Sequence, residues 1–411
     1  MMRRLQTLLP RAEVAAPASG PDVTGQLEGI LRAAVNEGAS DIHFEPKERG
    51  LAIRFRLDGE TRLHAELPLA QRDPLIARGK ILGGLDITEK RLPQDGRAVF
   101  HEAKRRYHLR LSTLPTAHGE NLVIRLLDQT MPRQPFEQLG LAEQQATDLR
   151  EALTGPPGLI YLTGPTGSGK TTTLHAALHL LDQPGRVIHT LEDPVEYEFA
   201  SLCQTEIREK IGLTFASALR GLLRQDPNII LVGETRDAET AGLAIEAALT
   251  GHRVLSTLHT NDALTAIPRL RKLHIESHLI AATLRLVAAQ RLLGRLCPEC
   301  KERHPESARL AERHGFAVAD FFRPRGCPAC HGRGYRGRLA IHEVIPVAPF
   351  EGLIEAEAPL SEFITRRDQA GYVTLRQRGL AAAAAGHTSL AEVERVLGIF
   401  TGPAGPQPAN P

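Results

Sequence analysis

The stretch LIYLTGPTGSGKTTTL, residues 159–174, joins an apolar run to the spacing GxxxxGK[ST] and a helix-forming continuation. A strand, a glycine-rich loop and a helix in this order are typical of a phosphate-binding loop. Backbone N–H groups can surround a β-phosphate, while the lysine reaches the β- and γ-oxygens and the next threonine binds Mg²⁺. A turn that binds nothing is the less favoured alternative. The predicted nucleotide-binding residues are Gly164, Pro165, Thr166, Gly167, Ser168, Gly169, Lys170, Thr171 and Thr172.

Three further apolar segments are each followed by charged or polar side chains. Doubly wound parallel sheets carry their chemistry at such carboxyl ends of strands. Strand and helix patterns alternate from about residue 140 to 290, which predicts a parallel sheet covered on both faces. The three segments are VIHTLEDPVEYEF (187–199), NIILVGETRD (228–237) and TGHRVLSTLHTNDA (250–263).

The composition is that of an ordinary globular protein, with 42% hydrophobic and 24% charged residues. A chain of 411 residues is expected to form two or three domains. The net charge is only +2, and aromatic residues make up 4% with no tryptophan. Neither feature favours a nucleic-acid partner, so no direct nucleic acid contact is expected. No run of about 18 apolar residues occurs, so no membrane span is expected.

Four of the five cysteines form two CxxC pairs, in LCPECKERH and GCPACHGRGYRGR. Four thiolates suit tetrahedral zinc, and a site closed by four sulfur atoms is structural rather than catalytic. An iron–sulfur cluster is the alternative, and His304 and His331 are nearby competing ligands. Cys203 lies outside both pairs and is expected to be buried among apolar residues. The predicted Zn²⁺ ligands are Cys297, Cys300, Cys327 and Cys330.

Four ordered motifs, together with the cysteine segment, resemble the secretion ATPases of type II secretion and type IV pilus assembly. In that family the motifs correspond to the phosphate loop, an acidic box, an atypical second nucleotide motif and a histidine box. The resemblance, over about residues 24–398, implies an α/β fold with a RecA-like P-loop ATPase core. It also implies a smaller α+β (PAS-like) N-terminal domain and a C-terminal tetracysteine metal module plus helices. The matching segments are GPTGSGKTTTL, LEDPVEYEF, GLTFASALRGLLRQDPNIILVGETRDAET and TGHRVLSTLHTNDA.

The apolar run of NIILVGETRD ends in Gly-Glu, whereas many nucleotide-hydrolysing strands end in an aspartate that helps to hold magnesium. Hydrolysis requires a group that orients or deprotonates the attacking water, and groups that hold Mg²⁺. The resemblance implies that Glu234 activates the water, and that Glu192, with Asp193 and Glu196 near it, acts on Mg²⁺ or its water shell. Glu192 as the base is the alternative. His259 is expected to sense the γ-phosphate or to join neighbouring subunits through a hydrogen bond.

Arginines stabilise the charge that develops on a transferred phosphoryl group. Arg220 and Arg224 are four residues apart, on one face of the helix predicted before the Glu234 strand. The resemblance implies that both face phosphate. It also implies that Arg110 and Arg125 come from the N-terminal domain and close over the nucleotide. Each of the four could instead be a surface ion-pair residue.

Patterns along the chain predict six segments and a hairpin turn at Asp58-Gly59. The prolines and glycine of residues 129–140 have the composition of a linker. The leucines of the leader could also form a short docking helix. The segments are a flexible leader (1–23), an N-terminal α+β domain that supplies arginines (24–130), the RecA-like ATPase core (131–290), the tetracysteine zinc module (291–345), a C-terminal helical region (346–400) and a disordered tail (401–411).

The resemblance implies a cytoplasmic ring ATPase, a homo-oligomer that is typically a hexamer and lies peripheral to the inner membrane. Its expected cofactors are ATP, Mg²⁺ and Zn²⁺, and its expected partners are the inner-membrane platform and cytoplasmic-domain proteins of a secretion or pilus machine. Only about 20 residues precede the shared region, so docking is expected to use the leader or another surface. The segment GYRGRLAIHEV favours pseudopilus assembly in type II secretion. Alternatives are type IV pilus assembly, pilus retraction, DNA uptake and a scaffold without turnover.

Overall fold

The computed structural model of the chain describes residues 22–57, 59–103, 105–128, 134–316 and 319–399. The chain forms two compact units, Met1–Met131 and Pro132–Pro411. The predicted leader up to residue 21 and the predicted tail lie outside the described residues. No helix in the described part of the chain has the length and hydropathy that a bilayer crossing requires.

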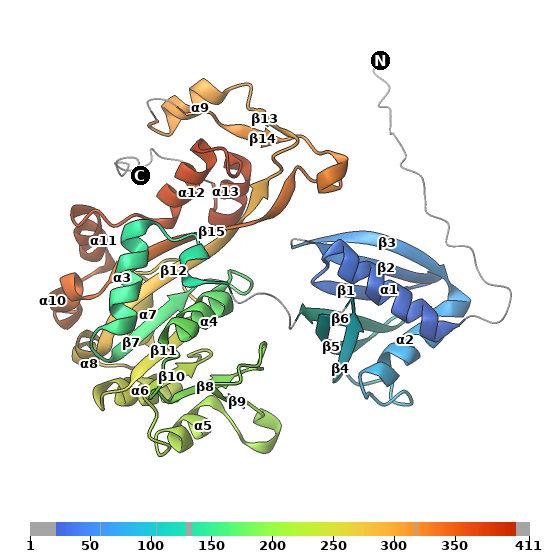
Figure 1. Cartoon of the computed structure of the whole chain (residues 1–411), viewed down its shortest axis with the longest axis horizontal. Coiled ribbons are helices and arrows are strands. Elements are labelled where there is room, and N and C mark those ends of the chain that lie inside the picture. Colours follow the sequence, from blue (N-terminus) through green and yellow to red (C-terminus); the bar gives the residue numbers. More distant parts are fainter. Residues whose placement is uncertain (1–21, 58, 104, 129–133, 317–318, 400–411) are drawn as a thin grey trace. The chain divides into compact units, whose positions relative to one another are not determined.

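The N-terminal unit contains a six-stranded antiparallel sheet in the order β3-β2-β1-β6-β5-β4 (Figure 1). Its core joins apolar residues of two helices, such as Leu31 and Leu75, to inward residues of the sheet, such as Phe44 and Ile124. The predicted hairpin is confirmed, since β2 and β3 pair on either side of it. The elements are α1 (Val23–Glu37), β1 (Asp41–Lys47), β2 (Gly50–Leu57), β3 (Glu60–Pro68), α2 (Leu69–Leu82), β4 (Gln94–Glu102), β5 (Arg105–Thr116) and β6 (Gly119–Asp128).

The second unit contains a seven-stranded sheet in the order β15-β12-β7-β11-β10-β8-β9. Six strands are parallel, which confirms the predicted parallel sheet, and β15 is an antiparallel edge strand. The central strands β7, β10 and β11 are buried along their whole length, as strands covered on both faces of a sheet are, and β10 is a continuous apolar run. The strands are β7 (Gly158–Thr163), β8 (Ile188–Glu192), β9 (Cys203–Glu206), β10 (Ile229–Val232), β11 (Arg253–Leu258), β12 (Leu284–Leu296) and β15 (Tyr335–Pro346).

Helices cover both faces of this sheet, as Figure 1 shows. On one face, α3 (Glu143–Thr154) and α4 (Lys170–Leu181) pack on Ile160 and Leu162. Phe136, in the 3₁₀ turn η1 (Phe136–Gln138), and Leu139, which follows this turn, join the same core. The end of the predicted linker segment is therefore packed against the sheet. The opposite face is covered by α5 (Phe215–Leu222), α6 (Ala238–Leu249), α7 (Ala266–Lys272) and α8 (Ser277–Thr283).

The cysteine segment connects β12 and β15, the last two strands at one side of the ATPase sheet. β12 and β15 pair along most of their length, from Leu286↔Pro346 to Leu296↔Tyr335. The chain between them forms β13 (Lys301–Arg303), α9 (Ser307–Arg313), β14 (Phe322–Pro324) and η3 (Pro328–Cys330). After β15 come η4 (Ala348–Phe350), α10 (Glu351–Glu355), α11 (Leu360–Gln369), α12 (Leu375–Ala384) and α13 (Leu390–Leu397), and the last two lie on either side of Gly386.

Candidate functional site

The predicted phosphate loop connects the end of β7 to the start of α4, at the carboxyl edge of the parallel sheet. Gly164 and Gly169 have φ angles of 148° and 89°. A Cβ at Gly164 would lie 2.7 Å from the Gln290 carbonyl oxygen, and one at Gly169 would lie 2.6 Å from Gln290 Nε2. Only glycine fits both the conformation and the space. The loop therefore leads into the N-terminal turn of a helix, where free N–H groups favour an anion.

The Lys170 side chain folds back over its own loop. Its Nζ donates hydrogen bonds to the carbonyl oxygens of Gly164, at 2.7 Å, and Pro165, at 3.1 Å. Burial lowers the pKa of Lys170; the charge of Glu234 opposes this effect and that of Arg291 adds to it. Both side chains are thus close enough to act electrostatically on the lysine.

Glu234 follows β10 at the same edge of the sheet, and its side chain is 16% exposed. Arg236 forms an ion pair with one of its oxygens, and His259 Nε2 lies 3.5 Å from the other. Arg236 Nη2 also lies 3.7 Å from Asp193 Oδ2. The ends of three neighbouring strands therefore bring two predicted acids to Arg236, and the predicted histidine to one of those acids. Arg236 was not predicted, although it stands two residues beyond Glu234.

Glu192 ends β8, beside β10, and is buried. Its Oε1 accepts hydrogen bonds from Thr190 Oγ1 at 2.6 Å and Gln204 Nε2 at 3.0 Å. His175 Nε2, from α4, lies 3.5 Å from its Oε2. Burial alone would raise the pKa of Glu192, but the neighbouring His175 ring and the hydrogen bonds from Thr190 and Gln204 outweigh this effect and lower the pKa. Glu192 is thus fixed by protein donors, whereas Glu234 is paired with charged groups.

The two arginines predicted on one helix face lie at the end of α5. Arg220 forms an ion pair with Glu239 in the first turn of α6, and its side chain is 53% exposed. Arg224 Nη1 donates a hydrogen bond to the Arg220 carbonyl oxygen at 2.9 Å. The structure places the two side by side, and a contact of either with phosphate stays a prediction.

Arg110 and Arg125 are directly opposite each other on β5 and β6 of the N-terminal unit. Asp41 is opposite Arg125 on β1, with its Oδ1 2.8 Å from Arg125 Nε. Arg56 on β2 and Arg97 on β4 continue the same row. Opposed residues of neighbouring strands face the same side of a sheet, so four arginines and one aspartate cross one face. That Arg110 and Arg125 close over the nucleotide stays a prediction.

Hydrogen bonds join the start of the phosphate loop to the segment that carries His259. The Gly164 N–H donates to the Leu258 carbonyl oxygen at 3.3 Å. Thr163 Oγ1 accepts from the Thr260 N–H at 2.9 Å and lies 3.1 Å from the Thr260 carbonyl oxygen. Thr163, the last residue of β7, was not predicted as part of the site. Its position just before the motif was the only indication in the sequence.

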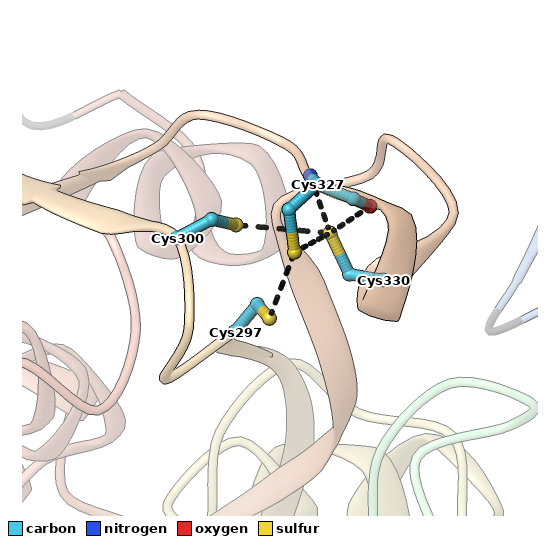
Figure 2. Close-up of side chains that lie close together, drawn as sticks. All are labelled: Cys297, Cys300, Cys327 and Cys330. Carbon is cyan, nitrogen blue, oxygen red and sulfur yellow. Dashed lines mark hydrogen bonds between the residues drawn. The ribbon is translucent and has the colours of Figure 1, made fainter.

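The four predicted cysteine ligands converge, as Figure 2 shows. All four sulfur atoms lie within 4.8 Å of one another. Three pairs are 3.7–3.9 Å apart, close to the ~3.8 Å between ligands of a tetrahedral zinc with 2.3 Å bonds. Cys330 Sγ also accepts hydrogen bonds from the N–H groups of Cys327, at 3.2 Å, and Gly334, at 3.0 Å. The donor set and its spacing fit one metal ion held by thiolates.

The structure also decides the remaining histidine and cysteine expectations. Within the described residues, the metal-binding group at this place contains the four cysteines and neither histidine. His304 Nδ1 instead accepts a hydrogen bond from the Glu306 N–H at 3.2 Å. The expectation that Cys203 is buried is wrong, because this residue begins β9, the edge strand opposite β15, and is exposed.

The sequence profile of the family described as Type II/IV secretion system protein matches residues 20–395. The chain belongs to this family. The type II secretion system ATPase E of Vibrio cholerae is 43% identical over 374 residues, which are 90% of this chain and 74% of that protein. The type IV pilus assembly ATPase PilB of Thermus thermophilus is 42% identical over 93% of this chain and 44% of that protein. The X-ray structure of the Legionella pneumophila ATPase DotB matches with a TM-score of 0.67 and 22% identity, over 90% of this chain and 95% of that one.

Membership of the type II/IV secretion system family confirms three predictions made from the sequence. These are the resemblance to secretion ATPases, the α/β fold with a RecA-like ATPase core, and the enzyme class of an ATPase. The relatives include both a type II secretion ATPase and a pilus assembly ATPase, in line with the preferred function and its first alternative. The roles of individual site residues and the domain boundaries stay predictions.

In this secretion ATPase, two consecutive ionisable residues of β15, His342 and Glu343, are buried. Burial, with a smaller contribution from Asp262, raises the pKa of Glu343 from 4.5 to about 7. Burial lowers the pKa of His342 to about 4, and its Nε2 lies 2.9 Å from the Leu139 carbonyl oxygen. A carboxyl group with a raised pKa binds its proton more tightly in the folded state, so its contribution to stability is lost as pH rises from 4.5 through 7.

Replacing Glu343 with glutamine is therefore expected to make the chain relatively more stable at high pH. Between pH 5 and pH 8, the free energy of unfolding of Glu343→Gln should rise relative to that of the wild type by up to ~3 kcal/mol. Thermal midpoints of the two proteins, measured across this pH range, should show the same trend. His342 has the opposite pH dependence but is present in both proteins, so its effect cancels in the difference. Parallel midpoint curves over this range would show that Glu343 is already ionised in the folded state.

Proposed function

We propose that this chain hydrolyses ATP within a cytoplasmic ring of identical subunits, and so powers pseudopilus assembly in type II protein secretion. The observation that carries the proposal is the convergence of Lys170, Glu234 and His259 at one edge of the sheet. The charge of Glu234 acts on Lys170, and His259 Nε2 is 3.5 Å from Glu234 Oε2. A cation for phosphate and a carboxylate for water are the groups that hydrolysis of ATP requires.

In the proposed mechanism each residue has one task. Phosphate oxygens replace the carbonyl oxygens of Gly164 and Pro165 as the acceptors of Lys170, and the N-terminal turn of α4 donates its free N–H groups. Glu234 then accepts a proton from the attacking water. His259, at the end of the neighbouring strand, donates a hydrogen bond to the terminal phosphate. Arg236 keeps the carboxylate of Glu234 in place through its ion pair.

Mg²⁺ is proposed to be held near the same edge by oxygen ligands. The donor set fits, because the Thr171 hydroxyl and the carboxylates of Asp193 and Glu196 are the hard oxygen groups that this ion prefers. The ion supplies positive charge for the phosphate oxygens. Glu192 is proposed to organise this acidic segment, since its carboxylate already holds Thr190 and Gln204.

Arg110 and Arg125 are proposed to take part in turnover, and Arg220 and Arg224 to face phosphate. Arg125→Ala is expected to reduce turnover far more than nucleotide affinity, because a residue that stabilises transition-state charge adds little to ground-state binding. In this variant the buried Asp41 still has an ion-pair partner, because Arg56 Nε lies 3.5 Å from Asp41 Oδ2. The measurement compares kcat with the Kd for ADP. Arg32→Ala, which removes ion pairs from α1, is the control, and equal losses of kcat and affinity in Arg125→Ala would count against the role.

The role in secretion is tested by co-purification from membranes of the source organism. We expect the chain to be recovered with an inner-membrane platform protein of a type II secretion machine, and to be lost from the membrane fraction when that protein is deleted. Recovery with the platform of a type IV pilus machine would instead support the second candidate, which the PilB relative favours. Recovery with neither, together with turnover stimulated by single-stranded DNA, would overturn both.

A further inference from the structure

β12 continues past the end of β7 and runs alongside the phosphate loop. The pairing of the two strands ends at Ala289↔Thr163. The next two residues of β12, Gln290 and Arg291, stay paired with β15 on one side, and on the other side they lie beside the phosphate loop. Both are buried, with 3% and 6% of their surface exposed. Buried polar side chains require partners, and these two find theirs in the nucleotide site.

Gln290 contacts the beginning of α4. Its Oε1 accepts a hydrogen bond from Thr173 Oγ1 at 2.8 Å. Its Nε2 packs against the backbone of Gly169, where a Cβ would lie only 2.6 Å away. The amide thus fixes the backbone immediately before Lys170 and the first turn of the helix that follows it.

Arg291 lies between the phosphate loop and the segment that carries His259. Its Nη2 donates a hydrogen bond to the Asn261 carbonyl oxygen at 2.7 Å, and its Nη1 donates to the Gln290 carbonyl oxygen at 2.9 Å. Nη1 also packs against Gly164, where a Cβ would lie 2.9 Å away. One guanidinium group therefore touches both loops, which the bonds between Thr163 and Thr260 already bring together.

The position of this arginine is energetically demanding. A guanidinium keeps its charge when buried, and burying a charge is unfavourable unless hydrogen bonds and opposite charges compensate. The carboxylates of Asp262 and Glu343 act on Arg291 from nearby, against the effect of burial. An apolar side chain would fill the same space without this cost, so packing alone does not account for the residue.

We propose that Arg291 is a positioning residue for ATP hydrolysis: its guanidinium holds residues 259–262 against the phosphate loop at Gly164, while Gln290 fixes the start of α4. The inference rests on the function proposed above for the phosphate loop. Lys170 and His259 can act on the same phosphate only if the two loops keep their spacing. Arg291 acts on turnover through that spacing and makes no contact with the nucleotide itself.

The test compares Arg291→Ala and Arg291→Lys in the full chain. Arg291→Ala is expected to lower kcat by ~30-fold or more, with KM and the Kd for ADP changed by less than ~3-fold. Arg291→Lys should recover only part of the loss, because an ammonium group cannot reproduce the two-pronged geometry. Arg285→Ala is the matched control and should stay within ~2-fold of the wild type. Arg285 is on the same strand, and its Nε donates to the Pro157 carbonyl oxygen at 3.1 Å, at the opposite end of β7.

A double-mutant cycle with His259→Ala shows whether Arg291 works through that segment. Adding Arg291→Ala to the His259→Ala variant should lower kcat by less than a further ~3-fold, because both changes disturb the same position of residues 259–262. Fully multiplicative losses, an unchanged kcat in Arg291→Ala, or an ADP affinity that falls as much as kcat would each overturn the proposal. If the alanine variant does not fold, the same criteria apply to Arg291→Lys.

Hydrogen exchange separates this proposal from the proposed function. ADP binding is expected to protect the amides of residues 259–262 in the wild type and in Arg285→Ala, but not in Arg291→Ala. If the wild type binds ADP and does not hydrolyse ATP, the proposed function fails, and this protection pattern still decides the role of Arg291. Equal protection in all three proteins would contradict it.

Discussion

Glu234→Gln is expected to lower steady-state phosphate release by ~10²–10⁴-fold while ATP binding is retained. Glutamine has the shape of glutamate but cannot take a proton from the attacking water. Glu234 is the predicted acid that lies close to both Lys170 and His259. The loss corresponds to about 3–5 kcal/mol of transition-state stabilisation. Phosphate release at saturating ATP, with a separate equilibrium measurement of ATP affinity, tests this expectation.

Glu192→Gln is the control that separates the two candidate bases. Glu192 is buried and accepts hydrogen bonds from Thr190 and Gln204, so the substitution should lower the thermal midpoint, at a cost of about 1–3 kcal/mol. Glu234→Gln should change the midpoint little, because its partner Arg236 is 54% exposed. If Glu192→Gln abolished turnover and Glu234→Gln retained more than a tenth of it, Glu192 would be the base.

The nucleotide motifs could be predicted from the sequence because each is a local arrangement. The strand, the loop and the first turn of α4 follow one another without a break, so the spacing of glycines and Lys170 already describes the cradle. Glu234 and His259 follow apolar strands, and parallel strands end at one edge of a sheet. The strand pattern therefore predicts that both lie at this edge, and the pairing of β10 with β11 brings them to 3.5 Å.

Gln290 and Arg291 could not be found in this way. Their position depends on β12 lying next to β7, although the two strands are far apart in the sequence. A boundary predicted between residues 290 and 291 divides the pair, because the cysteines that follow suggest a separate module. In the structure β12 is one strand of 13 residues that serves both the sheet and the cysteine segment.

Burial at the edges of the fold also depends on neighbours that the local sequence does not reveal. Cys203 is exposed because β9 has a partner on one side only. Phe136 lies in a segment with linker composition, yet it is 5% exposed because it packs with the core beneath α3 and α4. Tertiary contacts, which composition does not reveal, decide whether such a side chain is buried.

Replacing Cys297 and Cys300 together with serine is expected to remove one zinc ion per chain and to lower the thermal midpoint markedly. Cys297 follows β12 directly, and Leu296 is paired with Tyr335 at the start of β15. A metal held by the four sulfur atoms therefore closes the far end of the β12–β15 pair. Because metal binding to such a site is coupled to local folding, its loss reduces folding free energy directly. Elemental analysis and thermal unfolding, each with and without a chelator, are the measurements.

Cys203→Ser is the matched control, since this cysteine is exposed on β9 and lies outside the cluster. The control should keep its zinc and its thermal midpoint, and its response to chelator should equal that of the wild type. Iron with visible absorbance in the wild type would identify an iron–sulfur cluster, and full zinc content in the double variant would exclude these sulfur atoms as ligands. Because Cys297 directly follows the strand that carries Arg291, the same samples show whether the metal end of β12 affects its nucleotide end. An ADP affinity unchanged by zinc removal means that the β7 and β15 pairings hold Gln290 and Arg291 in place without the metal.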